Sequence, residues 1–149
     1  MAAPDIERWR RATQSRPLSR VLGMEAGERG EGFTQYRVVP VEANSDGLDG
    51  AEPGVGVSTF AITTAVDIAL VEAVSSTVDS ARQAMNGTAE LNLTFVAHPR
   101  GAVTLRAEVV HRGPTIRVAT VDVTDEDGRR VAFCRSTYAV RPVRPSSDA

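Results

Sequence analysis

The stretch that decides the fold covers residues 59–76 and reads TFAITTAVDIALVEAVSS. Apolar residues occur almost all round a helical projection of this stretch, so it predicts a buried central helix. One carboxylate, Asp67, lies in its middle, although burying an unpaired carboxylate is costly or forces it to take up a proton. Because functional sites tolerate such costs, Asp67 is a candidate general base or nucleophile. The alternative is a structural acceptor of hydrogen bonds from Thr63 and Thr64, or from backbone amides at a subunit contact.

Length and composition indicate one domain without a strong charge. At 149 residues, 42% of them hydrophobic, the chain has material for one well-packed core. Its net charge of -2 argues against a general nucleic-acid or membrane-surface binder, whose affinity needs excess positive charge. The single cysteine, Cys134, lies in a strand-like run and excludes an intrachain disulfide and a multi-cysteine metal site. We expect a small core residue there, and neither a metal nor a cofactor.

The N-terminal sequence gives no sign of export. Met1-Ala-Ala-Pro-Asp leads into sequence rich in Arg and Glu, without the apolar region of a signal peptide. The only long apolar run contains Asp67 and Glu72 and is therefore a poor membrane span. We expect a soluble, cytoplasmic protein.

The rest of the chain predicts a short helix and strands on both sides of the central helix. Pro4 to Thr13 has the early proline and acidic start of a helix, and we assign residues 1–18 to this helix and its lead-in. Residues 32–39 have the composition of a strand, with a hairpin turn at 28–32 before it. Four more strand-like runs follow the central helix, at 88–97, 102–111, 115–124 and 130–140. Residues 19–141 then form the main domain and residues 142–149 a disordered tail.

Turn signals set the expected order of these strands. Short separators rich in Gly, Pro and Asp join the last four runs, which argues for an antiparallel meander. Residues 40–56, by contrast, hold enough Gly, Pro, Asn and Asp to predict a long irregular loop, a type that is often functional.

The central helix also predicts an assembly. A helix that is apolar all round cannot be covered by a flat sheet on one side, so an α+β fold with a curled sheet is expected. A second subunit is the simplest cover for what remains. We expect a homodimer or a homotetramer, with strands paired across the interface and Asp67 near it.

Three segments carry a resemblance to a known family. They are residues 88–99 (TAELNLTFVAHP), 105–113 (LRAEVVHRG) and 121–132 (VDVTDEDGRRVA). They resemble the third to sixth strands of hotdog-fold thioesterases of the PaaI-like group, which includes phenylacetate-pathway and 4-hydroxybenzoyl-CoA thioesterase-like proteins. The resemblance spans about Leu22 to Val140. It implies a hotdog fold, in which a curled antiparallel sheet wraps a long central helix.

The resemblance also implies an acyl-CoA thioesterase. In this family a His-Gly-Gly motif opens the central helix, and an acidic residue eight positions after the first glycine is the base or nucleophile. Asp67 matches the acid, but the motif falls on Ser58, Thr59 and Phe60. By resemblance, the amide of Thr59 polarises the thioester carbonyl, as a free helix N-terminal amide can. Asp67 then attacks the carbonyl or activates a water, which Thr88 holds.

Further residues are candidates for binding the substrate. Ser58 and Phe60 lie at the entrance, although Ser58 also fits a plain helix N-cap. The family's Asn upstream of the motif falls on Glu52 by ungapped counting, and Asn44 is the alternative if the loop is expanded. The phosphates of coenzyme A need cations, and Arg100 and Arg112, which follow the third and fourth strands, are the candidates.

Two functions remain open at this point. The first is the acyl-CoA thioesterase. The second is a non-catalytic hotdog protein that binds an acyl or aromatic CoA-type ligand, because Thr59 and Phe60 add side chains where the thioester would pass. The absence of histidine at the start of the central helix and within it argues against hotdog dehydratases. Glu72 lies roughly 140° around the helix from Asp67, so we expect a helix-end charge rather than a second catalytic acid.

Overall fold

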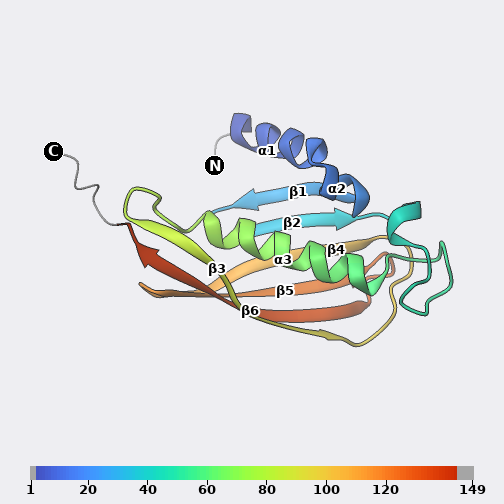
Figure 1. The fold of residues 1–149 in the computed structure, drawn as a ribbon. Helices are drawn as coiled ribbons and strands as arrows, with labels where there is room; N and C mark the ends of the chain where they lie inside the picture. Colours follow the sequence, from blue (N-terminus) through green and yellow to red (C-terminus); the bar gives the residue numbers. More distant parts are fainter. Residues whose placement is uncertain (1–2, 144–149) are drawn as a thin grey trace.

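A computed structural model describes residues 3–143, which form one six-stranded antiparallel sheet around a central helix (Figure 1). The elements in chain order are α1 (Ala3–Ser15), α2 (Pro17–Val21), β1 (Met24–Gly30), β2 (Phe33–Val38), the 3-10 turn η1 (Glu42–Asn44), α3 (Thr59–Ser75), β3 (Gln83–Phe95), β4 (Val103–Arg112), β5 (Ile116–Asp125) and β6 (Arg130–Pro142). The sheet curls around α3, which confirms the predicted α+β hotdog architecture. Residues 144–149 of the predicted tail lie outside the described range.

Helix α3 begins as its sequence predicts. Ser58 is the N-cap, and its hydroxyl accepts a hydrogen bond from the amide of Ala61. Eight residues of α3 are buried against the sheet: Ala61, Ile62, Ala65, Val66, Ala69, Leu70, Ala73 and Val74. Their spacing of three and four residues makes one continuous apolar stripe. The sheet therefore covers one face of the helix, and the face that carries Phe60 and Asp67 stays partly open.

The strand order is β1-β2-β4-β5-β6-β3. The predicted meander is correct for β4, β5 and β6 but wrong for β3, which pairs with β6 rather than with β4. The turn signals at 98–101 mark a crossing over the end of the sheet instead of a hairpin. Seven residues, 96–102, join β3 to β4, and they reach roughly 20 Å, more than the ~14 Å of three strand spacings.

The two edges of the sheet differ. Helix α1 lies along β1 in Figure 1, and Arg10 of α1 donates hydrogen bonds to the carbonyl of Gly27 in β1. At the other edge, no strand in residues 3–143 pairs with the outer side of β3. Strand β3 begins at Gln83, five residues before the predicted start, and is 13 residues long. A long open edge of this kind is a ready template for pairing with another chain.

The C-terminal half of α3 is tied to the N-terminal part of the chain. The carboxylate of Glu72 pairs with Arg16 at 3.1 Å and with Arg29 at 3.3 Å. Trp9 of α1 is buried against Tyr36 of β2, with their ring centroids 5.3 Å apart. Glu72 is thus a structural charge near the end of α3, as predicted.

No helix within residues 3–143 has the length and apolar character needed to cross a membrane.

Candidate active site

The carboxylate of Asp67 is held by two hydroxyl groups. Its Oδ1 accepts a hydrogen bond from the phenol of Tyr138 at 2.8 Å and another from Thr88 Oγ1 at 3.1 Å. Within the described residues, no donor reaches Oδ2. The suggested acceptor role toward Thr63 and Thr64 is wrong, because these hydroxyls donate to the carbonyls of Thr59 and Phe60 one turn earlier.

The pairing of β3 with β6 brings the two hydroxyls together. Thr88 and Tyr138 are directly opposite each other in the antiparallel register, and opposite residues project from the same face of a sheet. A bulge follows Thr88, and Ser136 donates a hydrogen bond to the carbonyl of Glu90 just beyond it. Tyr138 is fully buried, whereas Thr88 is exposed and Asp67 is partly exposed. The carboxylate therefore lies between the core and an open surface.

Two neighbouring groups are kept neutral by this environment. Burial raises the pKa of the Tyr138 phenol well above its ordinary value, and the hydrogen bond to Asp67 raises it further. Burial likewise raises the pKa of the Cys134 thiol to about 11, with the negative charge of Asp67 as the second cause. Cys134 is buried in the core, as predicted, and is not a thiolate nucleophile at neutral pH.

The Thr59 amide, which is predicted to polarise the thioester carbonyl, already donates a hydrogen bond to a carboxylate. The N–H of Thr59 donates to Asp49 Oδ2 at 2.8 Å, and the N–H of Ala51 donates to Oδ1 of the same side chain at 3.1 Å. Burial of Asp49 opposes its ionisation, but these amides outweigh that effect and lower the pKa of the carboxyl. Asp49 therefore holds a negative charge at the positive end of α3.

The other residues predicted around the helix entrance have different surroundings. Phe60 is exposed on the open face of α3, and the Ser58 hydroxyl is used in the N-cap. Asn44 is buried, and its amide nitrogen donates to the carbonyls of Leu22 and Val39. Both amide hydrogens of Asn44 are thus engaged with backbone, and we assign this residue to the structure of the loop rather than to substrate binding.

Arg100 lies beside the N-terminus of α3. Gly56 and Gly101 form an isolated bridge, which joins the loop before Ser58 to the turn that carries Arg100. The two segments border a groove lined by Ala51, Glu52, Val55, Gly56, Val57, Ala97, His98, Pro99, Arg100 and Arg129. Arg100 is exposed, whereas Arg129 is paired with Asp125.

Arg112 is at the opposite end of the molecule. It closes β4, about 30 Å from the start of that strand by the strand rise, and it pairs with Glu31. Arg100 and Arg112 therefore cannot hold the same phosphate within one protomer. Of the two predicted cations, only Arg100 is close to the Thr59 amide.

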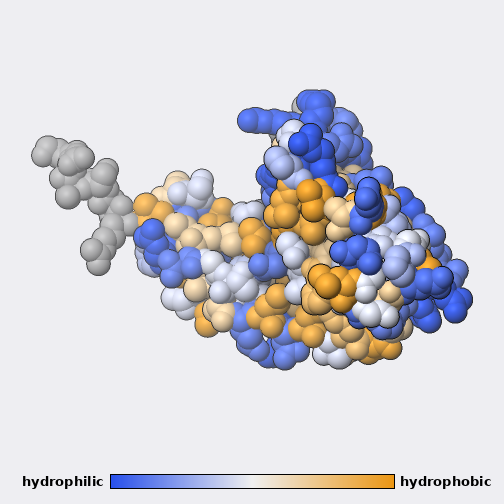
Figure 2. All heavy atoms as spheres, turned by 45° about the vertical axis from the view of Figure 1, so that its right-hand side comes forward, coloured by the Kyte–Doolittle hydropathy of each residue, from blue (hydrophilic) through white to orange (hydrophobic). Residues whose placement is uncertain are grey.

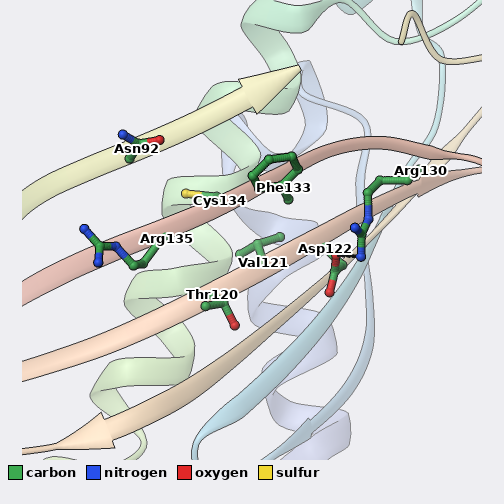
Figure 3. A pocket seen from close by; sticks show the side chains of 8 residues that line it. All are labelled: Asn92, Thr120, Val121, Asp122, Arg130, Phe133, Cys134 and Arg135. Atoms are coloured by element: carbon green, nitrogen blue, oxygen red, sulfur yellow. Dashed lines mark ion pairs between the residues drawn. The ribbon is translucent and has the colours of Figure 1, made fainter. Parts of the chain in front are cut away.

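A second groove lies on the outer face of the sheet, away from α3. Figure 3 shows Asn92, Phe133 and Arg135 on the near side of the strands, with Arg130 joined to Asp122 by an ion pair. Cys134 also lines this groove, but its side chain is buried toward the helix side. Asp67 and the two residues that donate to it, Thr88 and Tyr138, do not line this groove.

Two functional candidates were missed at the level of sequence. Tyr138 was counted only as part of a strand, and Asp49 only as part of a loop. The sequence predicted a meander in which β3 pairs with β4. It therefore did not predict the pairing of β3 with β6, which brings Tyr138 to Asp67. No local pattern marks Asp49, which contacts the helix through the folding of a loop ten residues before Thr59.

Comparison with known proteins supports the resemblance. The sequence model of the thioesterase superfamily matches residues 61–132, just under half of the chain. A search of curated proteins gives no match. The match includes Asp67 and Thr88 but neither the Ser58-Thr59-Phe60 segment nor Tyr138.

Solved structures show the same fold at low sequence identity. A mutant thioesterase from Pseudomonas aeruginosa superposes with a TM-score of 0.77 at 20% identity, covering 95% of this chain and 97% of that one. A thioesterase from Haemophilus influenzae gives 0.76 at 17%, with 96% and 94% covered. The PaaI protein of the E. coli phenylacetic acid degradation operon gives 0.70 at 14%, with 93% and 92% covered. These structures confirm the hotdog fold, and the family model over residues 61–132 supports a thioesterase-type function.

Proposed function

We propose that this protein is an acyl-CoA thioesterase in which Asp67 acts as the base or the nucleophile. The observation that carries the proposal is the state of the Asp67 carboxylate, whose Oδ1 is held by two hydroxyls while Oδ2 has no donor among the described residues. As a base, Asp67 takes a proton from water, the hydroxide attacks the thioester carbonyl, and the thiolate of coenzyme A leaves with that proton. As a nucleophile, Asp67 attacks the thioester carbonyl and expels the thiolate of coenzyme A, and water then hydrolyses the acyl anhydride to release the carboxylic acid and the free Asp67 carboxylate.

The oxyanion donor of this site comes from a second protomer in our proposal. Thr59 and Asp67 are eight residues apart on one helix, which separates them by about 12 Å along the axis. A single carbonyl needs its carbon near the carboxylate and its oxygen about 3 Å from the amide. Two helices that lie antiparallel across a dimer can satisfy both conditions, because the Thr59 amide of one chain then approaches Asp67 of the other.

Two surfaces support such a homodimer. The open edge of β3 lies beside Asp67, since Thr88 belongs to that strand and bonds the carboxylate. The outward face of α3 also carries apolar side chains, with Phe60 57% exposed and Ile68 and Val71 partly exposed. Figure 2 turns the end of the molecule with the 40–58 loop toward the viewer and shows hydrophobic patches there among hydrophilic residues.

Because the proposed substrate is a CoA thioester, we propose that the assembly acts in the cytoplasm.

A hydrolysis screen tests the proposed function directly. The purified chain is assayed against short, long and aromatic acyl-CoAs, with release of the free thiol as the signal. We expect turnover of at least one class, since the screen covers the acyl groups that the structure leaves undetermined. Absence of turnover across the set, together with measurable binding of an acyl-CoA, would favour the second function below.

Arg100→Ala tests recognition of the nucleotide. We expect weaker binding of acyl-CoA and a smaller dependence of KM on salt, because an exposed guanidinium interacts with phosphate mainly through screened charge. A pantetheine thioester without the nucleotide should be hydrolysed as by the wild type. The matched control is Arg112→Ala at the far end of β4. Equal losses on both substrates would remove Arg100 from the nucleotide site.

A non-catalytic ligand-binding protein is the second candidate, and one contact favours it. The carboxylate of Asp49 accepts the hydrogen bond of the Thr59 N–H, and a substrate carbonyl must reach this N–H for hydrolysis. In this alternative the contact is permanent, and the site binds an acyl or aromatic CoA-type ligand without turnover.

Asp49→Ala separates the two candidates. In an enzyme whose substrate displaces Asp49, the variant should raise kcat/KM about 10-fold, because a hydrogen bond to a charged group no longer competes for the amide. In a binding protein, the same change should create hydrolysis where the wild type has none. Steady-state kinetics on the best acyl-CoA of the screen measure both outcomes, with Asp46→Ala in the same loop as control. Unchanged kinetics would show that Asp49 does not compete with substrate.

A further inference from the structure

Tyr138 is the most firmly held group around the Asp67 carboxylate. Its side chain is fully buried in the core, and its phenol is the closer of the two donors to Oδ1, at 2.8 Å. Thr88, the other donor, is an exposed residue on the edge strand. A buried tyrosine has only two side-chain torsions to order, and both are fixed here by packing. The rigid donor to Asp67 therefore comes from β6 rather than from the edge strand.

We propose that Tyr138 is a positioning residue for thioester hydrolysis, which fixes the carboxylate of Asp67 so that Oδ2 faces the substrate. The inference rests on the proposed function. It assigns a role to a residue of β6 that lies beyond the matched segment 61–132 and that touches Asp67 rather than the substrate.

The chemistry of the contact supports positioning over proton transfer. The phenol is buried and beside a carboxylate, so it keeps its proton at physiological pH and remains a donor through the reaction. Two donors on Oδ1 restrict rotation of the carboxylate and stabilise negative charge on that oxygen. Oδ2, without a donor among the described residues, is left as the oxygen that meets water or the carbonyl carbon.

A purely structural role is the competing explanation. A buried phenol needs an acceptor, and Asp67 could serve Tyr138 rather than the reverse. The two explanations differ in what the loss of the hydroxyl changes. A structural role lowers stability and leaves kcat alone, whereas a positioning role lowers kcat at constant KM, whether or not the melting temperature also falls.

The test is Tyr138→Phe, which keeps the ring and removes the hydroxyl. We expect kcat to fall roughly 10- to 100-fold with KM nearly unchanged, as for a misplaced catalytic group. Tyr36→Phe is the matched control, because Tyr36 is equally buried and its hydroxyl has no partner among the described residues. It should keep the wild-type kcat. Melting temperatures of both variants are measured by circular dichroism.

A second variant, at the other donor to Asp67, keeps the test valid if one substitution disturbs the fold. Thr88→Val removes the other donor, and the double variant should lose more than the product of the two single losses, because each hydroxyl holds the carboxylate when the other is gone. The proposed function is established if the wild type hydrolyses an acyl-CoA and Asp67→Asn abolishes that hydrolysis. If Tyr138→Phe then keeps the wild-type kcat, or lowers only the stability, the positioning role is overturned while the thioesterase proposal stands.

Discussion

Asp67→Asn is expected to lower turnover of acyl-CoA by roughly 10² or more while binding stays the same or tightens. The amide has the shape of the carboxylate but can neither accept a proton from water nor attack a carbonyl. The structure indicates that this substitution changes the charge and leaves the surrounding contacts in place. The Asn oxygen can replace Oδ1 and keep the hydrogen bonds from Tyr138 and Thr88, so the sheet around it has no reason to rearrange.

Single-turnover kinetics and a binding titration on the same substrate measure the two effects separately. Glu72→Gln is the control, since Glu72 lies on the same helix but pairs with Arg16 and Arg29. It should lower the melting temperature and preserve kcat. Wild-type turnover that survives Asp67→Asn would contradict the catalytic assignment, and a lower melting temperature with unchanged kcat would assign Asp67 to structure.

Mixed dimers of two inactive chains should recover activity if each site takes Asp67 from one protomer and the Thr59 amide from the other. Thr59→Pro removes the N–H, and with it the hydrogen bond to Asp49, but should keep the start of the helix, because Thr59 is the first residue of α3 and proline is favoured there. Ser58 is extended, with φ -63° and ψ 150°, which suits a residue before proline. Loss of one oxyanion donor should lower kcat roughly 10²- to 10³-fold.

In a dimer of one Asp67→Asn chain and one Thr59→Pro chain, one site carries both changes and the other carries neither. The mixed dimer should therefore show about half of the wild-type activity. Two different affinity tags allow its purification. Thr59→Ala is the control, since it keeps the N–H and should keep most of the activity. Mixed dimers as inactive as their parents would place both groups in one chain and overturn the shared site.

Helix α3 shows how much of this molecule its sequence determines. The long apolar run of residues 59–76, the Ser58 N-cap and the position of Asp67 within the helix are local properties, in which each residue acts on neighbours within one or two turns. The same holds for the turns between β4, β5 and β6, where a few residues set the chain reversal. These features were predicted correctly because the information lies within a few residues of the feature itself.

The partners of Asp67 depend instead on contacts between distant segments. Tyr138 follows Asp67 by 71 residues and reaches it only because β3 lies outside β6, an order that turn signals at 98–101 cannot distinguish from a meander. Asp49 reaches the Thr59 amide through the path of an irregular loop. Arg100 and Arg112 look equivalent along the chain, yet opposite ends of β4 separate them. Strand pairing and loop packing are decided by burial of the whole core, so only the tertiary structure assigns these residues their neighbours.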